Sequence, residues 1–174
     1  MSVPFQMIME SEKLVAGSPK WSEPDGVDQK VKVIAALSLR GRVFRGLELI
    51  GRASLTLRNA DLSFTLVYHP TDNRRDAFQL ARIDWRPKVN HSNDHPKTPL
   101  ALLGDVDGSH HHSFDLNWAE KKGAPLKWLP VAEPIVPDFP SVSELIDGVG
   151  KLFRIANAGT ALSSPWPRDL FEKA

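Results

Sequence analysis

The sequence predicts one α+β domain, in which a mostly antiparallel, strongly bent sheet of about six strands carries one C-terminal helix packed across it. Three observations lead to this prediction. The length of 174 residues is typical of one domain. Apolar and polar residues alternate through consecutive short segments between residues 31 and 117, as they do in half-buried strands. Residues 141–157 instead repeat apolar side chains every three to four positions, which is typical of a helix with one buried face.

The first strands are expected to form a meander. Alternation is clear over residues 31–40, resumes over 43–50 and 53–58, and continues over 62–68 after a turn at 59–61. Turns this short cannot contain the crossover that parallel neighbours require. The pairing must therefore be antiparallel.

The next two strands are separated by a long loop. Over residues 78–85 the alternation changes phase, which predicts a β-bulge near Leu80 or, alternatively, a strand covered on both faces. Residues 86–108 contain few apolar side chains, and a loop of this length is usually functional or mobile. Alternation returns over residues 109–117. One face there carries His110, His112, Phe114 and Leu116, and the other carries His111, Ser113, Asp115 and Asn117.

The remaining segments flank this sheet, which spans residues 31–117. Residues 1–29 predict a short strand or helix followed by a loop. The prolines of residues 118–140 exclude a regular central strand or a long helix, so this segment is expected to wrap the sheet. Residues 158–174 form a tail, in which Leu170 and Phe171 are a last hydrophobic anchor.

The helix at residues 141–157 has a clear start signal. Ser141 and Glu144 form a capping box, in which each side chain bonds a backbone N–H of the first turn. Gly148 and Gly150 each weaken the helix by about 1 kcal/mol relative to alanine. We expect them to be tolerated because the backbone lies close to the sheet.

Composition excludes several classes of function. Lys and Arg total 22 and Asp and Glu total 21, so no overall field attracts nucleic acid or an anionic membrane. The chain has no cysteine, which excludes disulfides, thiolate metal sites and a cysteine nucleophile. It has neither a secretory signal nor an apolar run long enough to span a membrane, so we expect a cytoplasmic protein without a membrane partner. A local basic patch, or simply a solvated sheet face, is formed by Arg40, Arg42, Arg45, Arg52 and Arg58.

Histidines concentrate between Arg82 and Asn117. His110 and His112 lie on one face of a strand, roughly 6–7 Å apart at the backbone, and can chelate one metal ion. Zinc would need a third protein ligand, for which the available donors are Asp84, His91 and His95. Alternatively, the two histidines are interior residues that hydrogen-bond to their neighbours.

Acid–base chemistry is a further hypothesis for the same two histidines. One imidazole could take the proton of an RNA 2′-hydroxyl while the other protonates the leaving oxygen. Arg82, Lys88 and Arg86 would then hold the phosphate.

A resemblance to known families rests on short motifs in this region. The order Arg82-x-Asp84, His91-x-Asn93 and Gly108-x-His110-x-His112-x-Phe114, followed by a proline-rich stretch and a helix, resembles the TumE-like toxins of toxin–antitoxin modules and related phage and prokaryotic families with HxN and HxH motifs. The similarity covers roughly residues 31–157, and the chain departs from the pattern in the insertion 94–107 and in its proline-rich tail. The resemblance implies a mobile-element or defence context and action on RNA. The matching site positions are Arg82, Asp84, His91, Asn93, His110 and His112.

These arguments give one main hypothesis and two alternatives. The main hypothesis is a toxin-like or defence-associated protein that binds or cleaves RNA, with no metal ligand or cofactor assigned. It places catalysis on His91, His110, His112 and Asp84, and substrate binding on Arg82, Asn93, Lys88 and Arg86. The alternatives are a non-catalytic phage or mobile-element inhibitor that binds a protein partner, such as an antitoxin or a defence-complex component, and a metal-dependent enzyme with an HxH site.

Overall fold

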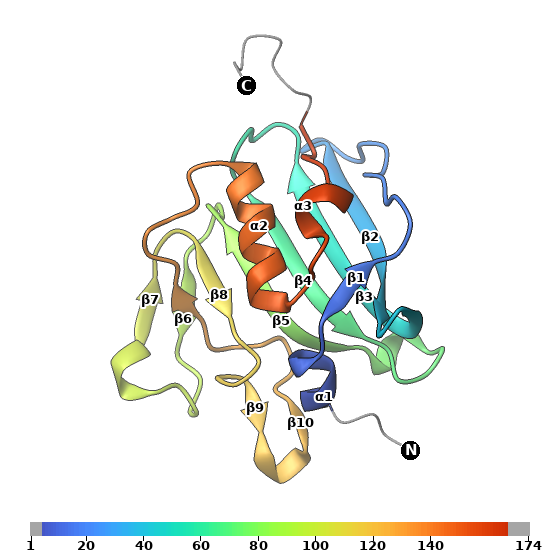
Figure 1. The fold of residues 1–174 in the computed structure, drawn as a ribbon. Coiled ribbons are helices and arrows are strands. Elements are labelled where there is room, and N and C mark those ends of the chain that lie inside the picture. The colour runs from blue at the N-terminus through green and yellow to red at the C-terminus, as the bar shows by residue number, and fades with distance from the viewer. Residues whose placement is uncertain (1–4, 167–174) are drawn as a thin grey trace.

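The computed structural model describes residues 5–166, which form one large sheet with helices on one face and a small hairpin beside it (Figure 1). The helical segments are α1 (Phe5–Glu10), η1 (Arg74–Asp76), η2 (Leu100–Leu102), η3 (Glu120–Lys122), α2 (Val142–Phe153) and α3 (Ala158–Ala161). The strands are β1 (Lys13–Val15), β2 (Lys30–Leu39), β3 (Arg42–Ser54), β4 (Leu62–Tyr68), β5 (Phe78–Trp85), β6 (His91–Asn93), β7 (Gly104–Val106), β8 (His110–His112), β9 (Trp118–Ala119), β10 (Ala124–Pro125) and β11 (Glu133–Pro134).

The main sheet has seven strands in the order β1-β2-β3-β4-β5-β8-β11, and every neighbouring pair is antiparallel. The predicted antiparallel α+β fold is therefore confirmed. The chain is a simple meander only from β1 to β5. Beyond β5 it leaves the sheet to form the separate hairpin β6–β7, and returns as β8. The proline-rich segment also contributes one edge strand, β11, in addition to the small hairpin β9–β10.

Three of the strand boundaries expected from the sequence are wrong. The strands expected at 43–50 and 53–58 are one continuous strand, β3. The strand can continue through Gly51 because this residue has no side chain, whereas a Cβ there would come within 3 Å of Val33, Trp21 and Phe64. The strand expected at 109–117 ends at His112, because the chain then turns and Asn117 N–H donates to Phe114 O at 3.1 Å. The loop at 86–108 contains the paired strands β6 and β7.

Of the two interpretations of the phase change at residues 78–85, the β-bulge near Leu80 is found. Leu66 pairs with Ala81 and Val67 with Gln79, so Leu80 has no partner across β4. The extra residue shifts the alternation of β5 by one position. As a result Arg82 and Asp84 share one face of β5, and the other face presents Ile83 and Trp85 to the core.

The core lies between the sheet and α2, whose apolar face contributes Leu145, Val149 and Phe153 (Figure 1). Half of the predicted capping box is present: Glu144 N–H donates to Ser141 Oγ at 3.3 Å, whereas the Glu144 carboxylate accepts from the Ser141 hydroxyl at 3.4 Å instead of from its backbone N–H. The helix ends at Phe153, four residues earlier than expected, because Arg154 takes a left-handed conformation with φ of 56°.

Both helical glycines lie close to neighbouring groups, but these groups are not in the sheet, where we expected them: a Cβ at Gly148 would overlap the ring of Phe139, and one at Gly150 would lie 3.0 Å from Ile155 O. The anchor predicted at Leu170 and Phe171 lies outside the described residues. None of the helices described within residues 5–166 has the length and apolar character needed to cross a membrane.

Candidate metal centre

The register between β5 and β8 brings four predicted site residues onto one face of the sheet. His112 pairs with Arg82, His111 with Ile83, and His110 with Asp84. Side chains of successive strand residues point to opposite faces, and Ile83 belongs to the core beneath α2. His110, His112, Arg82 and Asp84 therefore lie on the face away from α2, whereas the ring of His111 lies 6.1 Å from that of Phe153 in α2.

His91 joins this group from the separate hairpin. Its ring centroid lies 5.4 Å from that of His110 and 4.6 Å from that of His112. The three residues each offer one ring nitrogen, and these nitrogens all lie within 4.8 Å of one another. His110 is 2% exposed and His112 is 0% exposed. The folded chain thus gathers three imidazoles in a largely buried cluster.

Backbone carbonyls fix the protons of all three imidazoles. His110 Nδ1 contacts Gly108 O at 2.8 Å, His112 Nδ1 contacts Leu129 O at 2.6 Å, and His91 Nε2 contacts Pro130 O at 2.8 Å. A carbonyl oxygen only accepts hydrogen bonds, so the nitrogen facing it carries the proton. In each neutral ring the other nitrogen then carries a lone pair. Metal-binding histidines in proteins are commonly oriented in this way.

Asp84 faces two of these lone pairs. Its Oδ2 lies 3.2 Å from His110 Nε2 and 3.2 Å from His112 Nε2. Two acceptor atoms at this separation repel each other unless a proton or a cation stands between them. Arg82 supplies one such charge, since its Nε donates to Asp84 Oδ2 at 2.8 Å and its Nη2 to His112 Nε2 at 2.7 Å.

The pKa values agree with this distribution of charge. Burial raises the pKa of the Asp84 carboxyl, but the neighbouring side chains of His110 and His112 and the positive charge of Arg82 outweigh burial and hold the pKa well below its ordinary value. Burial lowers the pKa of His112 to about 4, against the opposing effect of Asp84. At neutral pH the carboxylate is therefore ionised and His112 is neutral, which is the state that binds metals.

The carbonyls that orient His91 and His112 belong to one buried segment, residues 129–132, which we call the strap. Two asparagine side chains hold it. Asn93 Nδ2 donates to Ala132 O at 2.7 Å, and its Oδ1 accepts from Ala132 N–H at 2.8 Å. Asn117 makes the equivalent pair of bonds with Val131 at 2.8 and 2.9 Å. Each asparagine amide thus makes the pair of backbone hydrogen bonds that a neighbouring strand would otherwise make. These bonds hold the strap in place outside any sheet.

Several residues assigned from the sequence have other roles. Asn93, expected to bind substrate, is 0% exposed, and its amide is fully engaged by the strap and by Leu102 O. Arg86, assigned to the same role, bonds Asp138, Phe139 O and Asn59 O, and its guanidinium lies over the ring of Trp85. In the structure both side chains are held by contacts within the protein.

Lys88 and His95 also have contacts of their own. Lys88 Nζ lies 3.9 Å from Asp28, and His95 Nδ1 accepts from the backbone of Lys97. Sequence reasoning missed Asn117 and the strap, because an asparagine that hydrogen-bonds backbone far along the chain leaves no local pattern.

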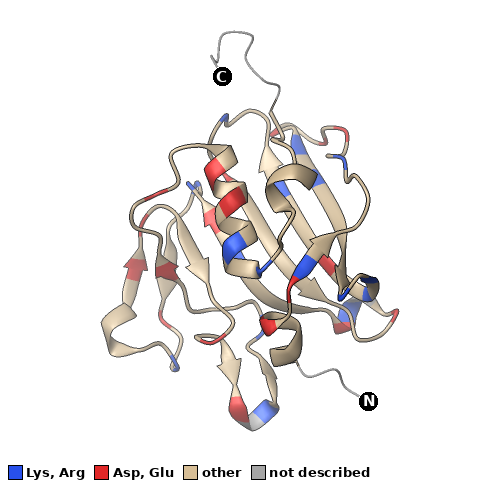
Figure 2. Cartoon of the chain, in the orientation of Figure 1, with Lys and Arg blue, Asp and Glu red and all other residues tan. Residues whose placement is uncertain are grey.

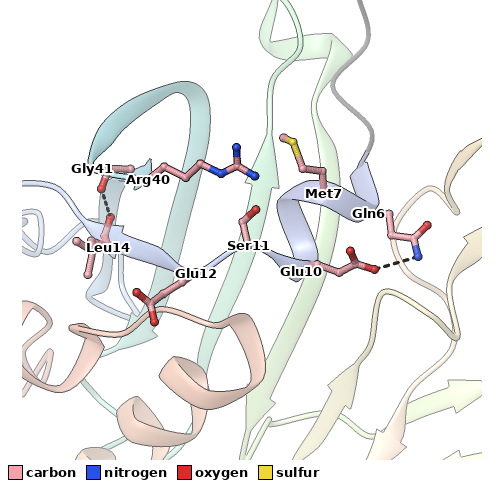
Figure 3. Close-up of a pocket in the computed structure, with 9 residues that line it drawn as sticks. Gln6, Met7, Glu10, Ser11, Glu12, Leu14, Arg40 and Gly41 are labelled. Atoms are coloured by element: carbon pink, nitrogen blue, oxygen red, sulfur yellow. Dashed lines mark hydrogen bonds between the residues drawn. The ribbon is translucent and has the colours of Figure 1, made fainter.

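Asp84 also opens onto a pocket of about 440 Å³. This volume is in the range of small-molecule sites. A larger cavity, of about 750 Å³, lies beside α1 and is lined by Gln6, Glu10, Glu12 and Arg40 among others (Figure 3). None of its lining residues belongs to the histidine cluster, and Gln6 Nε2 already donates to Glu10 Oε1 there at 3.1 Å. The smaller pocket adjoins the cluster through Asp84, whose carboxylate contacts His110 and His112.

Comparisons with known proteins leave this geometry as the basis for assigning a function. No family model, curated protein or solved structure matches the chain.

Proposed function

We propose that His91, His110 and His112 bind a divalent transition metal and that the protein is a metal-dependent hydrolase. The observation that carries this proposal is the convergence of three imidazole nitrogens within 4.8 Å, in rings that are each oriented by a backbone carbonyl at one nitrogen. Imidazole ligands suit zinc, copper, iron and nickel. Catalytic zinc sites typically use three protein ligands and keep a further position open.

The carboxylate-to-imidazole distances already match those around a bound zinc ion, whereas the three ring nitrogens, which lie within 4.8 Å of one another, would draw closer together on binding. Zinc lies about 2.0–2.1 Å from its nitrogen ligands, which in a tetrahedron places two ligand atoms about 3.3 Å apart. Asp84 Oδ2 lies 3.2 Å from both His110 Nε2 and His112 Nε2. The carboxylate therefore lies where a fourth contact to the ion would be made.

Arg82 is the competing cation of this site. Its guanidinium contacts both His112 Nε2 and Asp84 Oδ2, so a metal can reach His112 only if Arg82 releases that nitrogen. The Arg82 side chain is 25% exposed and can turn toward solvent. Metal binding should consequently become tighter when Arg82 is shortened.

A metal in this position would supply the chemistry of hydrolysis. Bound divalent ions polarise substrate oxygens and lower the pKa of water. The chain contributes three oriented imidazoles, a carboxylate with a low pKa and the pocket next to Asp84.

The test is metal binding by protein purified without an affinity tag. We expect one zinc ion per chain by elemental analysis after zinc loading and dialysis, and a saturable heat signal when zinc is titrated into metal-free protein. His112→Ala should abolish this stoichiometric binding, Arg82→Ala should strengthen it, and His95→Ala is the matched control outside the cluster. Equal metal content in wild type and His112→Ala would refute the proposal.

Metal-free RNA cleavage is a second candidate, supported by the position of Arg82. Its partly exposed guanidinium lies beside His112 and is able to bind a phosphate there. A toxin-like protein of this kind should inhibit growth when expressed and cleave RNA in the presence of a chelator. If the double substitution of His110 and His112 with alanine leaves both effects unchanged, this candidate fails.

A further inference from the structure

We propose that Lys32 and Arg52 form an anion-binding subsite for a phosphorylated substrate of the histidine centre, an inference that rests on the proposed function. Lys32 and Arg52 are directly opposite each other on β2 and β3. Like charges at directly opposed positions of an antiparallel pair destabilise it. Such an arrangement gains stability when an anion binds between the two cations.

Neither cation makes a close ion pair with a described residue. Within residues 5–166, no carboxylate lies within 4.0 Å of the charged groups of Lys32 or Arg52, whereas Lys30 on the same strand has Asp28 at 4.0 Å. Figure 2 shows Lys and Arg bands close together on β2 and β3, at the ends of these strands farthest from the β2–β3 turn. The two cations are therefore not held in ion pairs, although the carboxylates of Asp25, Asp61 and Asp84 line the same pocket.

The sheet register connects this pair to the histidine centre. Lys32 pairs with Arg52, Arg52 with Ser63, Ser63 with Asp84, and Asp84 with His110, so the five residues form one row across five strands. The row lies on the face away from α2, because the alternate residues of each strand belong to the core. Four of its members, from Lys32 to Asp84, line the pocket of about 440 Å³.

The spacing of the row indicates what kind of ligand fits. Adjacent strands lie about 4.8 Å apart, so the backbone of Arg52 is roughly 10 Å from that of Asp84. An anion held by Arg52, Lys32 and the Ser63 hydroxyl would therefore fix the position of the ligand. Another part of the same molecule would reach Asp84.

The chemistry of the lining narrows the ligand further. Arg and Lys together with a hydroxyl are typical phosphate-binding groups. Asp25 and Asp61 also line the pocket, and their carboxylates accept hydrogen bonds from hydroxyl groups. A phosphate joined to a hydroxyl-bearing unit such as a ribose satisfies both sets of groups.

The test measures anion binding by metal-free protein, so that it does not depend on the metal. Inorganic phosphate, adenosine monophosphate and a short single-stranded oligouridylate are titrated at low ionic strength. We expect adenosine monophosphate to bind, and the double variant Lys32→Gln/Arg52→Gln to weaken it about tenfold or more. The control, Arg45→Gln, removes an exposed arginine that pairs with Asp72 elsewhere. It should leave binding unchanged.

The results distinguish a nucleic acid from a small molecule as the source of the phosphate. They also test the subsite and the metal centre independently of each other. Binding of the oligouridylate much more tightly than the mononucleotide, with strong salt dependence, would identify a nucleic-acid backbone as the phosphate source, and comparable binding would identify a small molecule. Zinc binding that persists in the double variant, together with the loss of phosphate-ester binding, supports the subsite. If wild type binds zinc but none of the three phosphate probes, the subsite is refuted and the metal centre stands. If wild type binds phosphate esters but no zinc, the metal centre is refuted and the subsite stands.

Discussion

Replacing Asn93 with alanine should destabilise the fold and disorder the histidine centre, although Asn93 contacts none of the three histidines by a hydrogen bond. Its amide makes three bonds: to Ala132 O at 2.7 Å, from Ala132 N–H at 2.8 Å, and to Leu102 O at 2.8 Å. Ala132 is 0% exposed, so its backbone groups have no water to replace the lost partners.

The magnitude follows from these orphaned groups. A buried donor or acceptor left without a partner costs about 1–3 kcal/mol, so the two groups of Ala132 together cost about 2–6 kcal/mol. Water that enters the space left by the missing amide can bond these groups and so reduces this cost. We expect the free energy of unfolding to fall by about 2–4 kcal/mol.

The assay is urea unfolding followed by tryptophan fluorescence, combined with a zinc titration. Since the strap carries the carbonyls that orient His91 and His112, zinc affinity should fall by about tenfold or more even where the variant is fully folded. Ser92→Ala, at the exposed neighbouring position, is the control and should change stability by less than about 0.5 kcal/mol. A loss for Asn93→Ala no larger than that of the control would refute the role assigned to the strap.

Two further substitutions test the backbone and a buried charge. Gly46 has φ of +81°, and a Cβ there would overlap His69 O, so Gly46→Ala should cost more than about 3 kcal/mol in thermal unfolding. Gly41→Ala, with φ of +76° but open space, should cost only about 1 kcal/mol, and equal losses would contradict the steric argument. Burial, with a smaller contribution from Arg154, lowers the pKa of Lys13 from 10.5 to about 8. Below pH 8 Lys13 is charged in both the folded and the unfolded chain, and its burial reduces stability. From about pH 8 to 10.5 only the unfolded chain keeps the proton, so wild-type stability rises with pH, by up to about 3 kcal/mol. Lys13→Met should lack this rise, and parallel stability profiles over this pH range would show that Lys13 is not the cause.

Much of the fold is local in origin and follows from the sequence. The strands β2 and β4, the phase change at Leu80 and the N-terminal cap at Ser141 each depend on residues close together in the chain, and each is found in the structure. The errors arise where a distant contact overrides the local pattern. Gly51 joins two expected strands into one because Trp21 and Phe64 occupy the space of its missing side chain.

The candidate site divides in the same way. Strand alternation by itself put His110 with His112 and Arg82 with Asp84, because the direction of neighbouring side chains is a property of the strand. Only the tertiary structure determined that β8 pairs with β5, so that the two pairs meet, and that the hairpin β6–β7 brings His91 to the same face. Strand register and the contacts of the strap depend on residues far apart in the chain, whose pairing is set by packing of the whole domain. For this reason the opposed cations Lys32 and Arg52 also became visible only once the strands were aligned.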